Sequence, residues 1–134
     1  MPTLFVARSA NICQWASDVG LGKNIFKVGL CDGDPAPLVA AGWAGETDWK
    51  LLRQQDDVSL DETMMLERLV KRQKQVDPTY YPRVKGEMAL FKVTDAEVQR
   101  HIMLGRAMAQ ENEKAPIRLK AADYAAYLIA IATR

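Results

Sequence analysis

A cluster of basic side chains is the clearest candidate for chemistry in this sequence. Three of them share one face when residues 59–76 are placed 100° apart on a helix, and the fourth follows shortly after. They are Arg68, Lys71, Arg72 and Arg83. Such residues could bind the phosphates of DNA or RNA, but a solvated helix face has the same composition, so both interpretations stay open.

The residue types of common enzyme sites otherwise give weak signals. His101 is the only histidine, and no acidic partner or second metal ligand lies within sequence reach. Cys13 and Cys31 lack metal-ligand spacing and no secretory signal precedes them, so we predict free thiols in a reducing compartment and a cytoplasmic location. We find no Gly-x-Ser-x-Gly elbow, P-loop, His-Glu-x-x-His pattern or dinucleotide fingerprint.

Length and composition predict one globular domain, residues 1–134. The chain has 134 residues, of which 49% are hydrophobic and 26% charged, and these values exclude disordered and fibrous classes. A net charge of +1 is far from the excess of a strongly basic nucleic-acid binder. The longest apolar stretch, residues 119–132, is interrupted by Lys120 and Asp123 and is too short for a membrane span, so we expect no membrane partner.

Three runs rich in apolar, branched or aromatic residues predict strands over residues 3–7, 25–31 and 48–53. The polar connection of residues 8–24 predicts a mobile loop, and Asp34-Pro35 predicts a turn into a short helix that ends near Ala41. The expected fold is α+β: a small, mainly antiparallel three-stranded sheet flanked by helices, with the first two strands adjacent.

Capping boxes predict that two further helices begin at Ser59 and Thr94. The expected apolar face of the first consists of Met65, Leu66, Leu69, Val70 and Val76. Residues 87–93 between these helices predict an edge strand or an extended segment. A last helix, near residues 117–133, is apolar around nearly its whole circumference, so we expect it to pack centrally with Val98 and Ile102 or to form a homodimer interface.

The order of these elements, with two short tripeptides, resembles the GIY-YIG nuclease superfamily. Thr3-Leu4-Phe5 stands where Gly-Ile-Tyr would be, and Lys27-Val28-Gly29 stands where Tyr-Ile-Gly would be, followed by the Asp34-Pro35 turn. The Lys-Val-Gly form is similar to a branch of the superfamily in which lysine takes the second tyrosine position. The resemblance covers residues 3–93, and residues 94–134 form a helical extension outside it.

The resemblance implies a divalent-metal site and a phosphate site, but this sequence departs from both patterns. Glu67 is similar to the glutamate that binds the metal, Mg²⁺ or Mn²⁺, and the alternative is an exposed ion pair with Lys71 four residues along the helix. Lys27 could bind phosphate as a point charge or face solvent. Phe5 has no hydroxyl where the family has a tyrosine, and no Lys or Arg lies between Lys27 and Lys50, where the family has its arginine.

Three functions remain open from the sequence. The first is a degenerate, catalytically impaired domain with weak, non-specific nucleic-acid binding. The second is an active metal-dependent endonuclease with a rearranged site, which would use Lys27, Glu67 and an arginine from elsewhere. Arg8, Arg83 and Arg118 are the candidates for that arginine. The third is a protein-interaction or dimerisation domain that acts through the C-terminal helices.

Overall fold

The described part of the chain folds around one antiparallel sheet. The structure, a computed structural model, describes residues 2–110 and 116–134. Its strands are β1 (Thr3–Ser9), β2 (Ile25–Cys31), β3 (Trp49–Gln55), β4 (Lys74–Gln75) and β5 (Leu90–Lys92). Their order in the sheet is β3-β1-β2-β5-β4. The α+β class and the pairing of the first two strands are confirmed, but the sheet has five strands where three were predicted.

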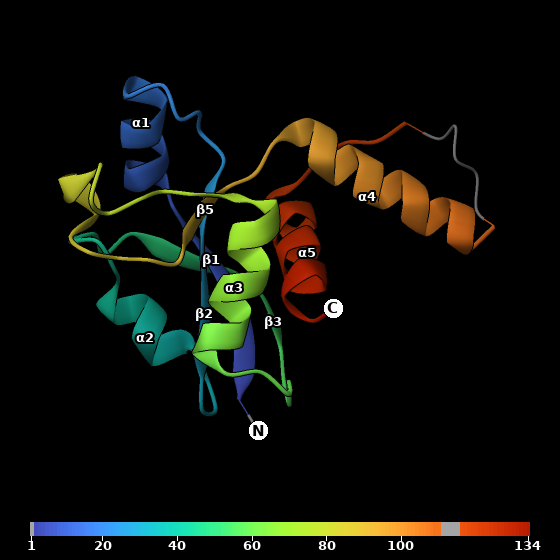
Figure 1. Cartoon of the computed structure of the whole chain (residues 1–134), viewed down its shortest axis with the longest axis horizontal. Helices are drawn as coiled ribbons and strands as arrows, with labels where there is room; N and C mark the ends of the chain where they lie inside the picture. Colours follow the sequence, from blue (N-terminus) through green and yellow to red (C-terminus); the bar gives the residue numbers. More distant parts are fainter. Residues whose placement is uncertain (1, 111–115) are drawn as a thin grey trace.

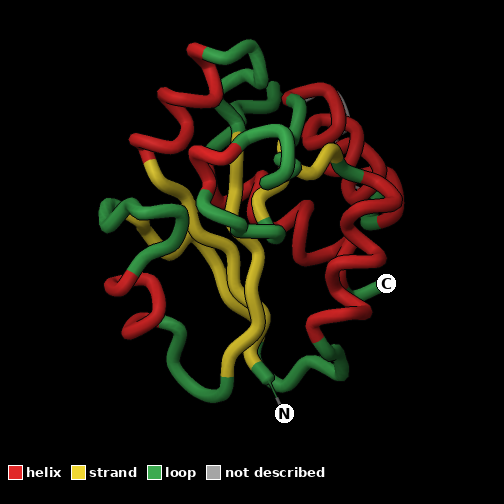
Figure 2. Tube along the Cα trace, turned by 60° about the vertical axis from the view of Figure 1, so that its left-hand side comes forward, coloured by secondary structure: helices red, strands yellow, loops and turns green. Residues whose placement is uncertain are grey.

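Helices cover both faces of this sheet (Figures 1 and 2). They are α1 (Ala10–Asp18), α2 (Ala36–Ala41), α3 (Glu62–Arg72), α4 (Asp95–Met108) and α5 (Ala121–Ala132), with a short 3-10 turn at Pro82–Val84. One core holds the buried side chains of α3 and α5 against the sheet, and a second core holds those of α1 and α2. We call the two sides of the sheet the α3/α5 face and the α1/α2 face. None of the helices in the described ranges is long and apolar enough to cross a bilayer.

A helix, α1, occupies part of residues 8–24, where the sequence predicted a mobile loop. Ser9 caps it, because its hydroxyl oxygen accepts a hydrogen bond from the Ile12 amide at 3.2 Å. The helix then buries Ile12, Cys13 and Ala16 against the α1/α2 face. The sequence predicted a loop because only these three small or medium side chains repeat with helical spacing, and the rest of the segment is mostly polar.

The start of α3 also differs from its prediction. Asp61 caps the helix by accepting from the Met64 amide at 2.8 Å, so the predicted capping box at Ser59 does not form. Val58 and Leu60 are buried on either side of exposed Ser59. This alternation requires an extended backbone up to residue 60, and the helix can begin only after it.

The apolar face predicted for α3 is partly confirmed. Met65 and Leu69 are fully buried and Leu66 is half-buried on the α3/α5 face. Val70 is 50% exposed, because the helix buries only a narrow stripe. Val76 lies beyond the helix and packs in the core of the α1/α2 face instead.

The strand predicted over residues 87–93 is shorter than expected and lies inside the sheet. β5 pairs with β2 on one side and with the two-residue β4 on the other, so β4 forms the edge. In this register Lys74 lies directly opposite Lys92. No pattern in the sequence marks two polar residues, Lys74 and Gln75, as a strand.

The last helix packs centrally, which is one of the two arrangements expected for it. The α5 side chains Tyr124, Leu128 and Ile131 are buried in the same core as Val98, with Ile102 packed against that core. The predicted capping box at Thr94 is present and opens α4. The rest of α4 projects away from the sheet (Figure 1), and Met103, Leu104 and Met108 are exposed on it.

Candidate functional site

Phe5 and Gly29 meet on the α1/α2 face, where the two tripeptides of the family resemblance lie side by side. They are partners in the β1–β2 register. A Cβ atom built on Gly29 would lie 2.5 Å from the Phe5 ring, so the ring occupies the space above this glycine. Trp43 stacks on Phe5, with ring centres 5.7 Å apart. An apolar stack therefore fills the position where the family has a tyrosine.

Lys27 is buried beside this stack and forms an ion pair. Its Nζ donates to Oε1 of Glu87 at 2.7 Å and lies 5.3 Å from the centre of the Trp43 ring. The same carboxylate oxygen accepts from the Ala89 amide at 3.1 Å. Lys27 is 6% exposed, so the solvent-facing interpretation of this residue is wrong. Its charge is already balanced by Glu87.

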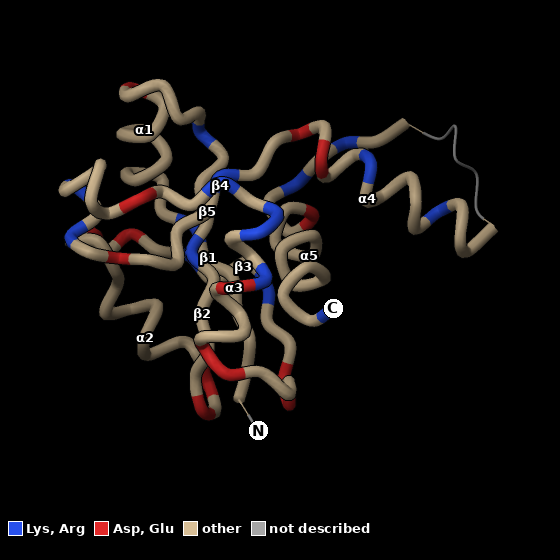
Figure 3. The backbone as a smooth tube through the Cα atoms, in the orientation of Figure 1, with Lys and Arg blue, Asp and Glu red and all other residues tan. Residues whose placement is uncertain are grey.

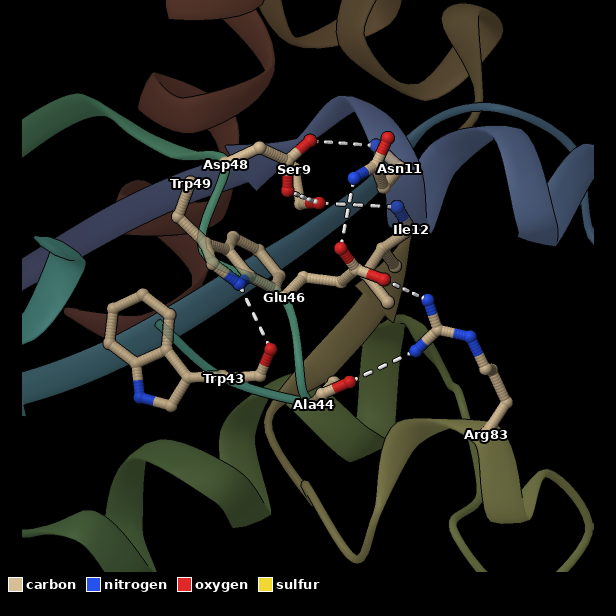
Figure 4. A network of polar contacts seen from close by, with 9 residues as sticks. All are labelled: Ser9, Asn11, Ile12, Trp43, Ala44, Glu46, Asp48, Trp49 and Arg83. Atoms are coloured by element: carbon tan, nitrogen blue, oxygen red, sulfur yellow. Dashed lines mark hydrogen bonds and ion pairs between the residues drawn. The ribbon is translucent and has the colours of Figure 1, made fainter. Parts of the chain in front are cut away.

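Arg83 lies on the same side of the sheet, and it too has a carboxylate partner (Figure 4). Its guanidinium donates to Glu46 and, at 2.9 Å, to the carbonyl oxygen of Ala44. The other oxygen of Glu46 accepts from the Asn11 side chain at 2.9 Å. These contacts tie the 3-10 turn and α1 to the loop of residues 43–48, and they leave Arg83 without a free charge for phosphate.

Asp48 completes this polar network next to β1. Its carboxylate accepts from the Ser9 hydroxyl and, at 2.9 Å, from the Asn11 amide (Figure 4). Burial raises the pKa of Asp48, but the hydrogen bonds from Ser9 and Asn11 outweigh it and lower the pKa below the ordinary value. This network joins β1, α1 and β3, and its polar groups are satisfied by one another.

The structure does not bring Glu67 to Lys27. Glu67 is exposed on α3, which packs on the α3/α5 face, whereas Lys27 projects from the α1/α2 face. Within residues 2–110 and 116–134, no group of three His, Cys, Asp or Glu side chains is arranged to hold a metal ion. The described residues therefore do not fit an Mg²⁺ or Mn²⁺ site at Glu67, and a metal there stays a prediction.

The basic residues predicted on α3 differ in what they contact. Arg68 donates to the carbonyl oxygen of Ala132 at 2.9 Å, at the end of α5. Lys71 and Arg72 are exposed, and no carboxylate of the described residues lies within ion-pair distance of either. The possible pair between Glu67 and Lys71 is thus not formed. Of the four predicted phosphate-binding residues, only Arg83 pairs with a described carboxylate, while Arg68 donates to a neutral carbonyl and Lys71 and Arg72 are exposed.

Acidic residues gather at one end of the molecule (Figure 3). One end, where β2 and β3 finish and α3 begins, carries six exposed acidic side chains. We call it the acidic end, and its members are Asp32, Asp34, Asp56, Asp57, Asp61 and Glu62. At the other end of α3 lie four cations that form no ion pair with any described carboxylate. This basic end consists of Lys71, Arg72, Lys74 and Lys92.

Several residues that make these contacts were not identified from the sequence. Glu87 is 60 positions from Lys27, and no local pattern links them. Trp43 and Glu46 lie in a connection whose sequence contains no motif. Lys74 and Lys92 become neighbours only through the β4–β5 register.

The family resemblance has no independent support from known proteins. Comparisons with protein-family models, with curated proteins and with solved structures give no match. The relation to the GIY-YIG superfamily thus stays a hypothesis based on the two tripeptides and the order of the elements.

Proposed function

We propose that this domain binds nucleic acid through its basic end without cleaving it. The observation that carries the proposal is the pairing of Lys74 with Lys92 in the β4–β5 register. Like charges directly opposite one another on neighbouring strands destabilise a sheet, and no described carboxylate forms an ion pair with either lysine. An external polyanion would offset this repulsion, and Lys71 and Arg72 beside it extend the same positive surface.

The acidic end would orient the protein on a bound nucleic acid. Phosphates would be attracted to the basic end and repelled from the opposite end of the sheet, where six carboxylates gather. Because contacts to phosphate carry no sequence information, the domain would bind any sequence. Neutralising about four phosphates would lower the affinity about a hundredfold between roughly 50 and 200 mM salt.

The side chains on the α1/α2 face are not suited to cleaving a bound strand. Phosphodiester cleavage needs a positioned nucleophile, a means of taking up developing negative charge and a cation on the phosphate oxygens. Phe5 has no hydroxyl, and Lys27 and Arg83 are both paired with carboxylates. Glu67 lies across the sheet from Lys27, so these groups cannot act on one phosphate.

The first prediction concerns the two opposed lysines. The double variant Lys74→Gln/Lys92→Gln should weaken oligonucleotide binding about tenfold or more at low salt. The slope of the logarithm of the affinity against the logarithm of the salt concentration should also become shallower, by the amount that corresponds to about two phosphate contacts. The same variant should leave the free energy of unfolding unchanged or raise it, because the repulsion is removed. Fluorescence anisotropy of labelled single- and double-stranded oligonucleotides and urea denaturation measure the two effects.

The matched control for this variant removes two charges from the opposite edge of the sheet. Lys50 and Arg53 are exposed on β3, which lies four strand spacings, about 19 Å, from β4. Lys50→Gln/Arg53→Gln should bind oligonucleotides almost as tightly as the parent. Equal losses from both double variants would mean that only net charge matters, and tight binding by Lys74→Gln/Lys92→Gln would refute the role of the basic end.

A second candidate function is self-association through α4, the helix that carries three exposed apolar side chains. Met103 is 46%, Leu104 59% and Met108 86% exposed. We infer a weak homodimer, in which these side chains cover one another in two copies. Light scattering across a range of concentrations should show dimers that Met103→Glu/Met108→Glu removes, and a monomer at every concentration would rule this out.

A further inference from the structure

A second concentration of positive charge surrounds a small cavity between α3, α4 and the end of the chain. The cavity has a volume of about 150 Å³. Arg72 from the end of α3, Arg100 from α4 and Arg134 after α5 line it, together with His101 and Tyr127. Three separate parts of the chain thus each contribute an arginine to the lining of one cavity. We call it the triple-arginine pocket.

No carboxylate neutralises these three arginines. Among residues 2–110 and 116–134, no acidic group lies within ion-pair distance of Arg72, Arg100 or Arg134. One acidic side chain lines the pocket, Glu97, and it accepts hydrogen bonds from the Thr94 hydroxyl at 2.7 Å and from the Tyr127 hydroxyl at 3.0 Å. Among the side chains of the lining, three positive charges therefore stand against one negative charge that is already hydrogen-bonded.

The arginine charges affect the pKa of both aromatic side chains of the pocket, Tyr127 and His101. Burial and the hydrogen bond to Glu97 raise the pKa of Tyr127 to about 12, while Arg72 and Arg100 act in the opposite direction. Burial lowers the pKa of His101, and the positive charge of Arg134 adds to the effect. His101 packs edge-on against Tyr127, with ring centres 5.5 Å apart.

We propose that the triple-arginine pocket binds a phosphate group. Guanidinium groups donate pairs of parallel hydrogen bonds that match the geometry of phosphate oxygens, and three of them from separate segments of the chain would contact one tetrahedral anion. The volume equals that of about five water molecules in the liquid, so a phosphate fits with a few waters beside it. Arg106, farther along α4, is not needed for this arrangement.

The source of the phosphate is a nucleic-acid backbone, and this part of the inference rests on the proposed function. Arg72 belongs both to the pocket and to the basic end, so a strand along Lys74 and Lys92 could place a neighbouring phosphate in the pocket. The pocket itself does not rest on the proposed function, because it would accept free phosphate by the same contacts.

His101 gives a direct reporter of pocket occupation, since the chain contains no other histidine. The titratable groups that line the pocket together with it are Arg72, Arg100, Arg134, Glu97 and Tyr127, and the Tyr127 ring packs against it. A bound dianion would offset the arginine charges, so the pKa of His101 measured by NMR should rise when inorganic phosphate is added, and the shift should saturate. A short single-stranded oligonucleotide is titrated in parallel to identify the source.

Two variants and one control separate the pocket from general electrostatics. Arg100→Gln and Arg134→Gln should each weaken phosphate binding about tenfold or more, and both residues are exposed, so circular dichroism should show an intact fold. Lys50→Gln removes the same charge from β3, at the opposite edge of the sheet, and does not line the pocket, so it should leave the phosphate affinity unchanged.

The possible outcomes distinguish this inference from the proposed function. If the His101 signal does not respond to phosphate, or if its response has the same phosphate affinity in all three variants, the pocket does not bind phosphate. A response to phosphate but not to the oligonucleotide keeps the pocket and refutes its nucleic-acid source. Oligonucleotide binding that depends on Lys74 and Lys92, together with a His101 signal that responds to neither phosphate nor oligonucleotide, supports the proposed function and refutes phosphate binding in the pocket.

Discussion

Lys27 shows how one partner decides what a residue can do. A lysine on a strand next to a short turn could bind phosphate, but here its ammonium group is buried against Trp43 and held by Glu87 at 2.7 Å. Taking such a charge out of water costs several kcal/mol, and the attraction to Glu87 offsets this cost only while both charges are present. The pair therefore contributes to stability and leaves no charge for a ligand.

The second prediction follows from that balance. Glu87→Gln should destabilise the fold by about 3 kcal/mol, because it leaves the Lys27 charge buried without a partner. Adding Lys27→Met, which keeps the length of the side chain, should recover a large part of this loss. Urea denaturation of the two single variants and the double variant measures the coupling. Additive losses in the double variant would show that the two charges are independent.

At the scale of elements, α1 depends on a cap that also belongs to another network. Ser9 accepts from the Ile12 amide and donates to Asp48, so one hydroxyl links the helix start to the loop before β3. Asp48 has a lowered pKa because of these hydrogen bonds. Folding therefore depresses its pKa, and its contribution to stability is present above the unfolded value of about 3.9 and lost as the pH falls through the folded value.

The third prediction tests this link. Ser9→Ala should lower the free energy of unfolding by about 1 kcal/mol or more at pH 7, because it removes both the cap and the bond to Asp48. Asp48→Ala should reduce the loss of stability between pH 7 and pH 3, and the double variant should cost less than the sum of the two. Ser17→Ala, exposed on the same helix, is the control and should have little effect. An unchanged acid profile in Asp48→Ala would disprove the link.

At the scale of the whole molecule, the sheet keeps apart the groups that a nuclease would need together. Lys27 and Arg83 lie with their partners on the α1/α2 face, and Glu67 lies with α3 on the other side. Cations without a described carboxylate partner instead gather at the basic end and around the triple-arginine pocket, and others lie elsewhere, as on β3. This distribution suits binding better than cleavage.

The fourth prediction is the absence of cleavage. Purified protein should show little or no Mg²⁺- or Mn²⁺-dependent cleavage of DNA or RNA at protein concentrations that bind the oligonucleotide fully. Nicking that is lost in both Glu67→Ala and Lys27→Met but kept in His101→Ala would contradict this and establish a rearranged active site. Nicking indifferent to Glu67 and Lys27 would indicate a contaminating nuclease.

The sequence predicted the elements better than the site. The apolar runs placed β1 and β2 side by side, and the capping box at Thr94 located the start of α4, because both depend on local patterns. α1 was missed because Ile12, Cys13 and Ala16 give too weak an apolar period. The partnership of Lys27 with Glu87 could not be predicted, since it depends on β5 turning back beside β2.

The short β4 has a consequence for behaviour at high concentration. Only two residues, Lys74 and Gln75, offer backbone groups at that edge of the sheet, and the lysine carries an uncompensated charge. The other edge, β3, exposes Lys50, Arg53 and two glutamines. Brief or charged edges resist the addition of a strand from another molecule, which is the first step toward fibrillar aggregates. Crowded copies of this chain would therefore stay as separate sheets, and contact between them would be left to their helices.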